Sequence, residues 1–251
     1  MRAEAGVVYL AGAGPGDPEL LTVRVVGLLE SCDVILPDDL VSDEVLALAD
    51  GPGRVRPAIV VPVGKRCGQP RITQAGIHEL MLLHAGAGRS VLRLKSGDPL
   101  VFGRASEEIA ALTEAGIRFE IVPGITTAFA VAAALKTPLT DRGAASKLIF
   151  ATAHHAAAKE GGGGLELTPK WEGAFPRDAT LVVYMPGRRF GLLAEELRAA
   201  GIAGETPCVA VSKASTKEER VTRTTLEGLG GMDAEAVGEA PAILMVGWAI
   251  R

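Results

Sequence analysis

The chain has 251 residues, which is enough for one large domain or two of ordinary size and excludes a small scaffold stapled by disulfides or metals. Hydrophobic residues make up 48% and charged residues 22%, with 31 Gly and 15 Pro, a composition typical of a globular protein with many tight turns. The 26 basic and 30 acidic side chains leave a formal charge of −4, so the sequence carries no electrostatic footprint of nucleic-acid binding.

Short β-branched runs alternate with helical patterns along the chain and predict α/β layers with largely parallel sheets. Capping residues mark two helix starts: Ser42 precedes one helix, and Thr73 precedes another that ends at Gly86. Residues 156–171 are of low complexity, so we expect a loop there. Residues 219–225 alternate as a strand should and predict antiparallel pairing near the C-terminus. The other expected strands are 7–11, 34–36, 59–63, 91–95, 119–122, 148–151, 181–185, 209–212 and 243–246.

A domain boundary is expected where Pro138, Asp141, Arg142 and Gly143 interrupt the apolar periodicity. The interruption predicts two α/β domains, residues 1–140 and 141–251.

The three cysteines, Cys32, Cys67 and Cys208, are widely spaced and odd in number, which fits a reducing compartment and gives no zinc-ligand pattern. No hydrophobic leader opens the sequence, and no apolar run approaches the roughly 18 residues of a membrane span. We therefore expect a cytoplasmic protein with no bound metal and no membrane or nucleic-acid partner.

A Gly/Pro-rich segment, residues 12–18, follows the first expected strand. It comes close to the dinucleotide-binding fingerprint G-x-G-x-x-G, but position 17 is Asp, and Pro15 and Pro18 remove amide donors from the turn. Asp38 lies where a ribose-binding acid would lie, so an NAD-dependent dehydrogenase stays open as an alternative.

Two more loops of similar chemistry follow later strands: one spans residues 96–99 (SGDP) and the other residues 123–127 (PGITT). If the three strands belong to one sheet, their loops outline a crevice at the carboxyl edge, where open α/β sheets bind ligands. Asp98 would suit a ligand with a positive centre, and the glycines would admit its bulk.

Several ordered motifs occur along the chain, at residues 12–22, 40–42, 64–66, 97–104, 122–126, 138–140, 184–185 and 241–247. Together they resemble the motifs of the uroporphyrinogen-III C-methyltransferases, a family of tetrapyrrole methylases. The resemblance implies a tetrapyrrole methylase fold, in which two α/β domains enclose an active-site cleft. It also implies S-adenosylmethionine as the methyl donor, S-adenosylhomocysteine as its product, and methylation of uroporphyrinogen III at C2 and C7 to precorrin-2, for sirohaem or cobalamin synthesis.

The resemblance also implies roles for individual residues. Asp38 matches the carboxylate proposed to accept a proton, and Lys65 the group proposed to donate one. A substrate with eight carboxylates asks for several cations, and Arg66, Arg104, Arg142 and Arg188 are the candidates beside Lys65. The implied cofactor contacts are Pro15, Ser96, Gly97, Asp98, Val101, Thr126, Thr127, Met185 and Ala214.

Other functions stay open at this point. A methylase acting on another precorrin or on a protein side chain would keep the cofactor loops, and a non-enzymatic tetrapyrrole carrier would keep only the cationic cleft. Pro37, Asp39, Ser96 and Asp141 depart from the family's usual residues, so tetrapyrroles other than uroporphyrinogen III stay open as substrates. The family implies a homodimer.

Overall fold

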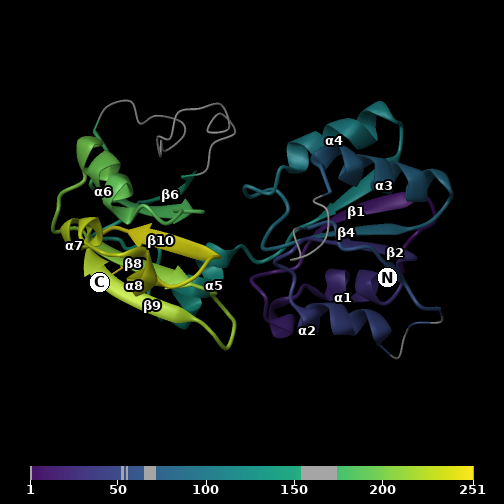
Figure 1. Cartoon of the computed structure of the whole chain (residues 1–251), viewed down its shortest axis with the longest axis horizontal. Helices are drawn as coiled ribbons and strands as arrows, with labels where there is room; N and C mark the ends of the chain where they lie inside the picture. Colours follow the sequence, from purple (N-terminus) through teal and green to yellow (C-terminus); the bar gives the residue numbers. More distant parts are fainter. Residues whose placement is uncertain (1, 52–53, 55, 65–71, 154–173, 251) are drawn as a thin grey trace. The chain divides into compact units, whose positions relative to one another are not determined.

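The computed structural model describes residues 2–51, 54, 56–64, 72–153 and 174–250. The chain divides into two compact units, Met1–Thr126 and Thr127–Arg251, and each is built around a five-stranded sheet (Figure 1). Among the described helices, none combines the length and the apolar character that crossing a membrane requires.

The sheet of the first unit is entirely parallel, with strand order β3-β2-β4-β1-β5. Gly12 at the end of β1 pairs with Lys95 of β4, and Ala11 pairs with Val122 of β5, so the neighbouring strands β4, β1 and β5 end at one level. The strands are β1 (Val7–Gly12), β2 (Val34–Pro37), β3 (Ile59–Val60), β4 (Val91–Lys95) and β5 (Arg118–Val122).

Helices cover both faces of this sheet, as parallel strands buried on two sides require (Figure 1). α1 and α2 pack on one face against Leu92 and Leu94, while α3 and α4 pack on the other against Val91. The predicted caps are confirmed, since the Ser42 and Thr73 side chains accept hydrogen bonds from backbone N–H groups of α2 and α3. The helices are α1 (Val23–Leu29), α2 (Asp43–Ala47), α3 (Gln74–Gly86) and α4 (Ala105–Glu114), with short 3₁₀ turns at Pro18–Leu20 and Leu48–Asp50.

The sheet of the second unit is mixed, with strand order β6-β7-β10-β8-β9. β6 and β7 are parallel, whereas β10 runs antiparallel to both β7 and β8, and β9 runs antiparallel to β8. The predicted antiparallel pairing near the C-terminus is therefore confirmed. The strands are β6 (Lys147–Thr152), β7 (Ala179–Tyr184), β8 (Pro207–Ser212), β9 (Arg220–Thr225) and β10 (Ala242–Val246).

The two faces of the second sheet carry different helices. α6 (Phe190–Ala199), α7 (Leu226–Gly230) and α8 (Ala234–Val237) pack on one face, in a core with Leu181 and Leu244. α5 (Thr127–Ala134) packs on the other face, where its Ala128 and Val131 share a core with Val182.

The boundary between the compact units lies between Thr126 and Thr127, before the boundary expected from the sequence at residue 140. The physical reason is the packing of α5, whose buried side chains contact the second sheet. The Pro and Gly residues near position 140 mark a turn inside the second unit, where Asp141 and Ala145 form an isolated bridge.

Candidate functional site

The loops that follow β1, β4 and β5 meet at the carboxyl edge of the first sheet, because these three strands are parallel neighbours. Gly14 and Gly97 exchange two backbone hydrogen bonds, with N–O distances of 3.1 and 2.7 Å. The Ala13 N–H donates to the Lys95 carbonyl at 2.6 Å. The prediction that three Gly/Pro loops leave one sheet edge together is thus confirmed.

These loops touch at three glycines, Gly12, Gly97 and Gly124, which we call the glycine junction. A Cβ on Gly12 would lie 2.5 Å from the Gly97 carbonyl oxygen and 2.7 Å from the Gly124 Cα, closer than side-chain carbons approach backbone. A Cβ on Gly124 would also meet the Gly97 carbonyl oxygen. The surface at this edge is therefore made of main-chain atoms.

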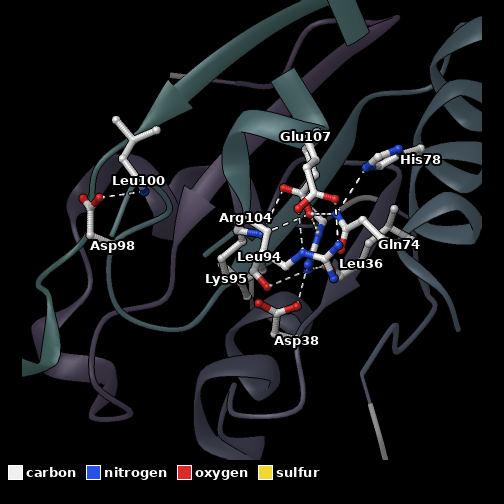
Figure 2. Close-up of polar contacts among 12 residues, drawn as sticks. Leu36, Asp38, Gln74, His78, Leu94, Lys95, Asp98, Leu100, Arg104 and Glu107 are labelled. Carbon is white, nitrogen blue, oxygen red and sulfur yellow. Dashed lines mark hydrogen bonds and ion pairs between the residues drawn. The ribbon is translucent and has the colours of Figure 1, made fainter. Parts of the chain in front are cut away.

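Asp98 ties two of these loops together. Its Oδ1 accepts a hydrogen bond from the Leu100 N–H at 2.9 Å (Figure 2), and its Oδ2 accepts one from the Gly124 N–H at 3.0 Å. Since both carboxylate oxygens serve the backbone, the geometry favours a role in shaping the loop over direct contact with a ligand's charge.

The other expected contacts of the first unit lie on or next to the same loops. Pro15 and Ser96 are half-buried on the first and second loops, and Val101 is half-buried farther along the second. Thr126, at the end of the third loop, is buried. The Ser42 hydroxyl donates to the Gly16 carbonyl at 2.8 Å and so joins the first loop to α2.

Asp38 directly follows β2, and β2 is a neighbour of β4 in the sheet. Its backbone N–H donates to the Leu94 carbonyl at 2.9 Å, and its Oδ1 accepts a hydrogen bond from Arg93 Nη2 at 2.5 Å. The side chain is 32% exposed, and Oδ2 accepts no hydrogen bond from the described residues. Asp38 therefore has one anchored oxygen and one available to a ligand.

Next to Asp38 lies a buried charge cluster, made of Arg93 and Lys95 on β4 and Glu108 on α4. Figure 2 labels Asp38 and Lys95 of this group. The Glu108 carboxylate is fully buried and accepts from Arg93 Nε and Lys95 Nζ, each at 3.0 Å. Burial lowers the pKa of Lys95, and the Arg93 charge adds to this, while Glu108 opposes it. With Asp38 included, two cations face two carboxylates, and removing one partner of such a buried pair typically costs about 3–5 kcal/mol.

Sequence reasoning missed this cluster, although a signal was present. Arg93 and Lys95 alternate with Leu92 and Leu94 in a strand expected to be buried on both faces. Two cations in such a strand require a buried acid as partner.

The expected proton donor, Lys65, and the substrate-binding candidate Arg66 lie outside the described residues. The described chain reaches Gly64, where an added Cβ would overlap the backbone nitrogen and the carboxylate of Asp39. The Val63 N–H also donates to the Pro37 carbonyl at 3.0 Å. The segment that ends at Gly64 therefore runs beside the end of β2.

In the second unit, three expected cofactor contacts lie around one edge of the sheet. β7 and β8 both pair antiparallel with β10, so they run parallel to each other and end on the same side. Met185 follows β7, is 45% exposed and has a φ of +50°. Ala214 follows β8 and is buried, and Thr127 begins α5, whose Ala128 N–H donates to the Tyr184 hydroxyl at 3.3 Å.

The three described arginines that were expected to bind substrate, Arg104, Arg142 and Arg188, are exposed. Arg104 makes two hydrogen bonds of 2.7 Å to the Glu107 carboxylate (Figure 2). These bonds raise the pKa of Arg104 and lower that of Glu107. Within the described residues, no group of three or more His, Cys, Asp or Glu side chains is placed to hold a metal ion.

The sequence profile of the Tetrapyrrole (Corrin/Porphyrin) Methylases matches residues 7–230. This range runs from β1 to the end of α7 and includes every described candidate site residue. The chain belongs to the tetrapyrrole methylases. The fold and the family that the motifs indicate are thereby confirmed.

Two relatives and one solved structure show how far this tetrapyrrole methylase resembles known proteins. The chloroplastic S-adenosyl-L-methionine-dependent uroporphyrinogen III methyltransferase of Arabidopsis thaliana is 42% identical over 242 residues, covering 96% of this chain and 63% of the relative. The S-adenosyl-L-methionine-dependent uroporphyrinogen III methyltransferase of Methanosarcina barkeri is 39% identical, covering 98% and 93%. A crystal structure of uroporphyrin-III C-methyl transferase from Thermus thermophilus, complexed with S-adenyl homocysteine, is 37% identical with a TM-score of 0.76, covering 97% and 93%.

This methylase thus spans less than two thirds of the Arabidopsis relative and nearly all of the Methanosarcina relative.

Proposed function

We propose that this tetrapyrrole methylase transfers methyl groups from S-adenosylmethionine to C2 and C7 of uroporphyrinogen III, forming precorrin-2 for sirohaem or cobalamin synthesis. The observation that carries the proposal is the glycine junction at the carboxyl edge of the first sheet, with Asp38 following the neighbouring strand β2. The names of the relatives and the S-adenyl homocysteine in the Thermus structure support it.

The residues at this edge fit the methyl donor. Gly12, Gly97 and Gly124 carry no side chain where the loops cross, so main-chain N–H and C=O groups can form the walls of a binding surface. The proposed contacts are Pro15, Ser96, Gly97, Val101 and Thr126 in the first unit, and Thr127, Met185 and Ala214 in the second, with Asp98 supporting the cofactor by shaping the loop that carries Ser96 and Gly97.

S-adenosylmethionine, when bound, supplies a methyl group that its sulfonium already activates. The protein therefore has two tasks: to align the reacting atoms, and to handle one proton for each methyl transferred. The unanchored oxygen of Asp38 accepts the proton that leaves the tetrapyrrole, and Lys65 is the second group proposed to take part in proton transfer. Neither task requires a metal or a covalent nucleophile.

The carboxylates of the substrate are held by Lys65, Arg66, Arg104, Arg142 and Arg188. The whole chain has a charge of −4, so the attraction must come from these local cations. Because Arg104 is paired with Glu107, a substrate carboxylate must share or displace that partner.

A nicotinamide cofactor fits the first sheet poorly. In dinucleotide-binding folds the first two strands are neighbours, which places the acidic residue of the second beside the glycine loop of the first. Here β4 lies between β1 and β2 and separates the loop after Gly12 from Asp38.

Incubation of the purified protein with methyl-labelled S-adenosylmethionine and uroporphyrinogen III, followed by mass spectrometry, tests the reaction. We expect products heavier by one and then two labelled methyl groups. Methylation of precorrin-2 or a later intermediate, with none of uroporphyrinogen III, would leave the family assignment standing and show the proposed substrate to be wrong. Calorimetric binding of NAD, with no binding of S-adenosylhomocysteine, would exclude the methyl-donor site.

Two substitutions test the proton-handling residues. Asp38→Asn should keep the affinity for S-adenosylhomocysteine, while turnover falls by about 10²–10⁴-fold, the usual contribution of a general base. Asp50→Asn, which neutralises an exposed carboxylate in the same unit, is the matched control and should leave turnover unchanged. Lys65→Ala should raise KM if Lys65 holds a carboxylate, or lower kcat alone if it donates a proton.

We also propose that the protein acts in the cytoplasm as a homodimer. Light scattering at micromolar concentration should give twice the 26.0 kDa of one chain. A mass of one chain would exclude the dimer.

A further inference from the structure

Arg93 is a buried cation on the central strand β4, and every nitrogen of its guanidinium donates a hydrogen bond. Nε donates to Glu108 Oε1 at 3.0 Å, Nη1 donates to the Leu36 carbonyl at 3.1 Å and more weakly to the Leu94 carbonyl, and Nη2 donates to Asp38 Oδ1 at 2.5 Å. The side chain is only 2% exposed. Bonds on three sides of a planar group leave it one orientation, so Nη2 is a fixed donor.

The fixed donor sets the position of Asp38. This residue lies just beyond β2; its backbone is still held by the hydrogen bond to the Leu94 carbonyl, but its side chain is partly exposed. A carboxylate in that place would be free to rotate if it had no partner. Because Oδ1 is anchored to Arg93, Oδ2 has a defined position.

Arg93 is itself held by the rest of the buried charge cluster. Glu108 is fully buried on α4, and Lys95 shares its carboxylate with Arg93. Gln74 of α3 adds a longer hydrogen bond to Glu108 Oε1, at 3.4 Å (Figure 2). Two helices on one face of the sheet therefore contribute to the orientation of a side chain at its edge.

We propose that Arg93 is a positioning residue for the methyl transfer: held by Glu108, it fixes the carboxylate of Asp38 where that group takes the proton from the substrate. The inference rests on the proposed function, because it takes Asp38 as the proton acceptor. If the cluster only stabilised the fold, the loss of kcat caused by an Arg93 substitution would not depend on whether Asp38 is intact.

The kinetic test is a double-mutant cycle between Arg93→Lys and Asp38→Asn. Lysine keeps the positive charge but lacks the planar guanidinium that holds the Asp38 carboxylate in one place. Arg93→Lys should therefore lower kcat by about 10²-fold, the effect expected when a catalytic group is displaced by about 1 Å. The KM for S-adenosylmethionine should stay unchanged. In the Asp38→Asn background, Arg93→Lys should cause no further loss of kcat.

Arg24→Lys is the matched control, because Arg24 makes two hydrogen bonds to the Glu120 carboxylate on the opposite face of the same sheet. It should leave kcat unchanged. An equal loss of kcat from Arg93→Lys with and without Asp38→Asn would overturn the proposal, since Arg93 would then act independently of Asp38.

Crystal structures of the wild-type protein and of Arg93→Lys give a readout that needs no turnover. The Asp38 carboxylate should move or occupy more than one rotamer in Arg93→Lys and keep its place in Arg24→Lys. If Arg93→Lys fails to fold, the charge-balanced pair Glu108→Met and Lys95→Met replaces it, because apolar residues often substitute for a buried ion pair without loss of stability.

An Asp38 carboxylate that keeps its wild-type position in these variants overturns the proposal, whether or not the protein methylates uroporphyrinogen III. A wild-type protein that methylates no tetrapyrrole instead overturns the proposed function.

Discussion

Gly12→Ala tests whether the glycine junction builds a binding surface. The new Cβ would lie 2.5–2.7 Å from backbone atoms of Gly97 and Gly124, where ordinary contact needs about 3.5 Å or more, so the loops must separate by roughly 1 Å. Separation strains the hydrogen bonds of Ala13 to Lys95, at the end of β4, and of Gly14 to Gly97, in the loop after it, each worth about 1 kcal/mol. We expect a loss of about 2–3 kcal/mol of unfolding free energy, in the range usual for overpacking.

Urea unfolding measures the stability change, and calorimetry with S-adenosylhomocysteine measures the effect on the site. Affinity should fall at least about tenfold, which corresponds to about 1.4 kcal/mol. Gly86→Ala is the matched control, because a Cβ there meets nothing within 4 Å, and it should leave both quantities within about 1 kcal/mol of wild type. A Gly12→Ala protein with unchanged stability and affinity would refute the reasoning.

Three further predictions concern single side chains. Asp98→Asn keeps only one of the two carboxylate oxygens that accept hydrogen bonds from the backbone of Leu100 and Gly124. Calorimetry should therefore show that S-adenosylhomocysteine binds at least about tenfold more weakly. An unchanged affinity would contradict this role of Asp98. Burial raises the pKa of Asp33, but hydrogen bonds from Ser90 outweigh it and leave the pKa below its usual range. The stabilisation is therefore present above the pKa of the unfolded chain, about 3.9, and is lost as the pH falls through the lower pKa of the folded state. Asp33→Asn should cost about 1 kcal/mol in urea at pH 7, allowing for screening of this exposed group, and less near pH 3; an equal cost at both pH values would be evidence against the assignment. Burial raises the pKa of Cys32 and Cys208 to about 12. In a Cys67→Ser variant, neither thiol should therefore react with iodoacetamide at pH 8 before the protein unfolds. Rapid labelling of the folded protein would count against the burial of these thiols.

The features that the sequence predicted well depend on neighbouring residues. The caps at Ser42 and Thr73 are local hydrogen bonds, so their signals lie within four residues. The meeting of the three loops needed one further assumption, that strands ending in glycine turns belong to one parallel sheet. The order β4-β1-β5 fulfils it.

The buried charge cluster depends on packing that no local pattern contains. Arg93 and Lys95 meet Glu108 only because α4 folds back over the sheet and turns that carboxylate inward. Sequence periodicity places Glu108 on a helix, but it does not reveal which strand residues the helix covers. The anchoring of Asp38 by Arg93 was missed for the same reason.

The membership of α5 could not be read from its sequence either. The helix is apolar on all sides, with residues such as Phe129, Val131 and Ala134, so no polar face shows which sheet it covers. Its packing against the second sheet assigns Thr126 and Thr127 to different units, although the two residues are neighbours in the sequence and the family resemblance implies both as cofactor contacts.

The glycine junction also bears on how such a protein can evolve. Main-chain atoms keep their places through most side-chain replacements, so a methyl-donor surface made of them is inherited almost unchanged as the rest of the sequence drifts. Arg142 and Arg188 are exposed side chains, and their replacement disturbs no core. If the glycine junction holds the methyl donor and these arginines hold the acceptor, selection can retune recognition of the acceptor one exposed residue at a time, while the steric intolerance of Gly12 and Gly124 preserves the donor site.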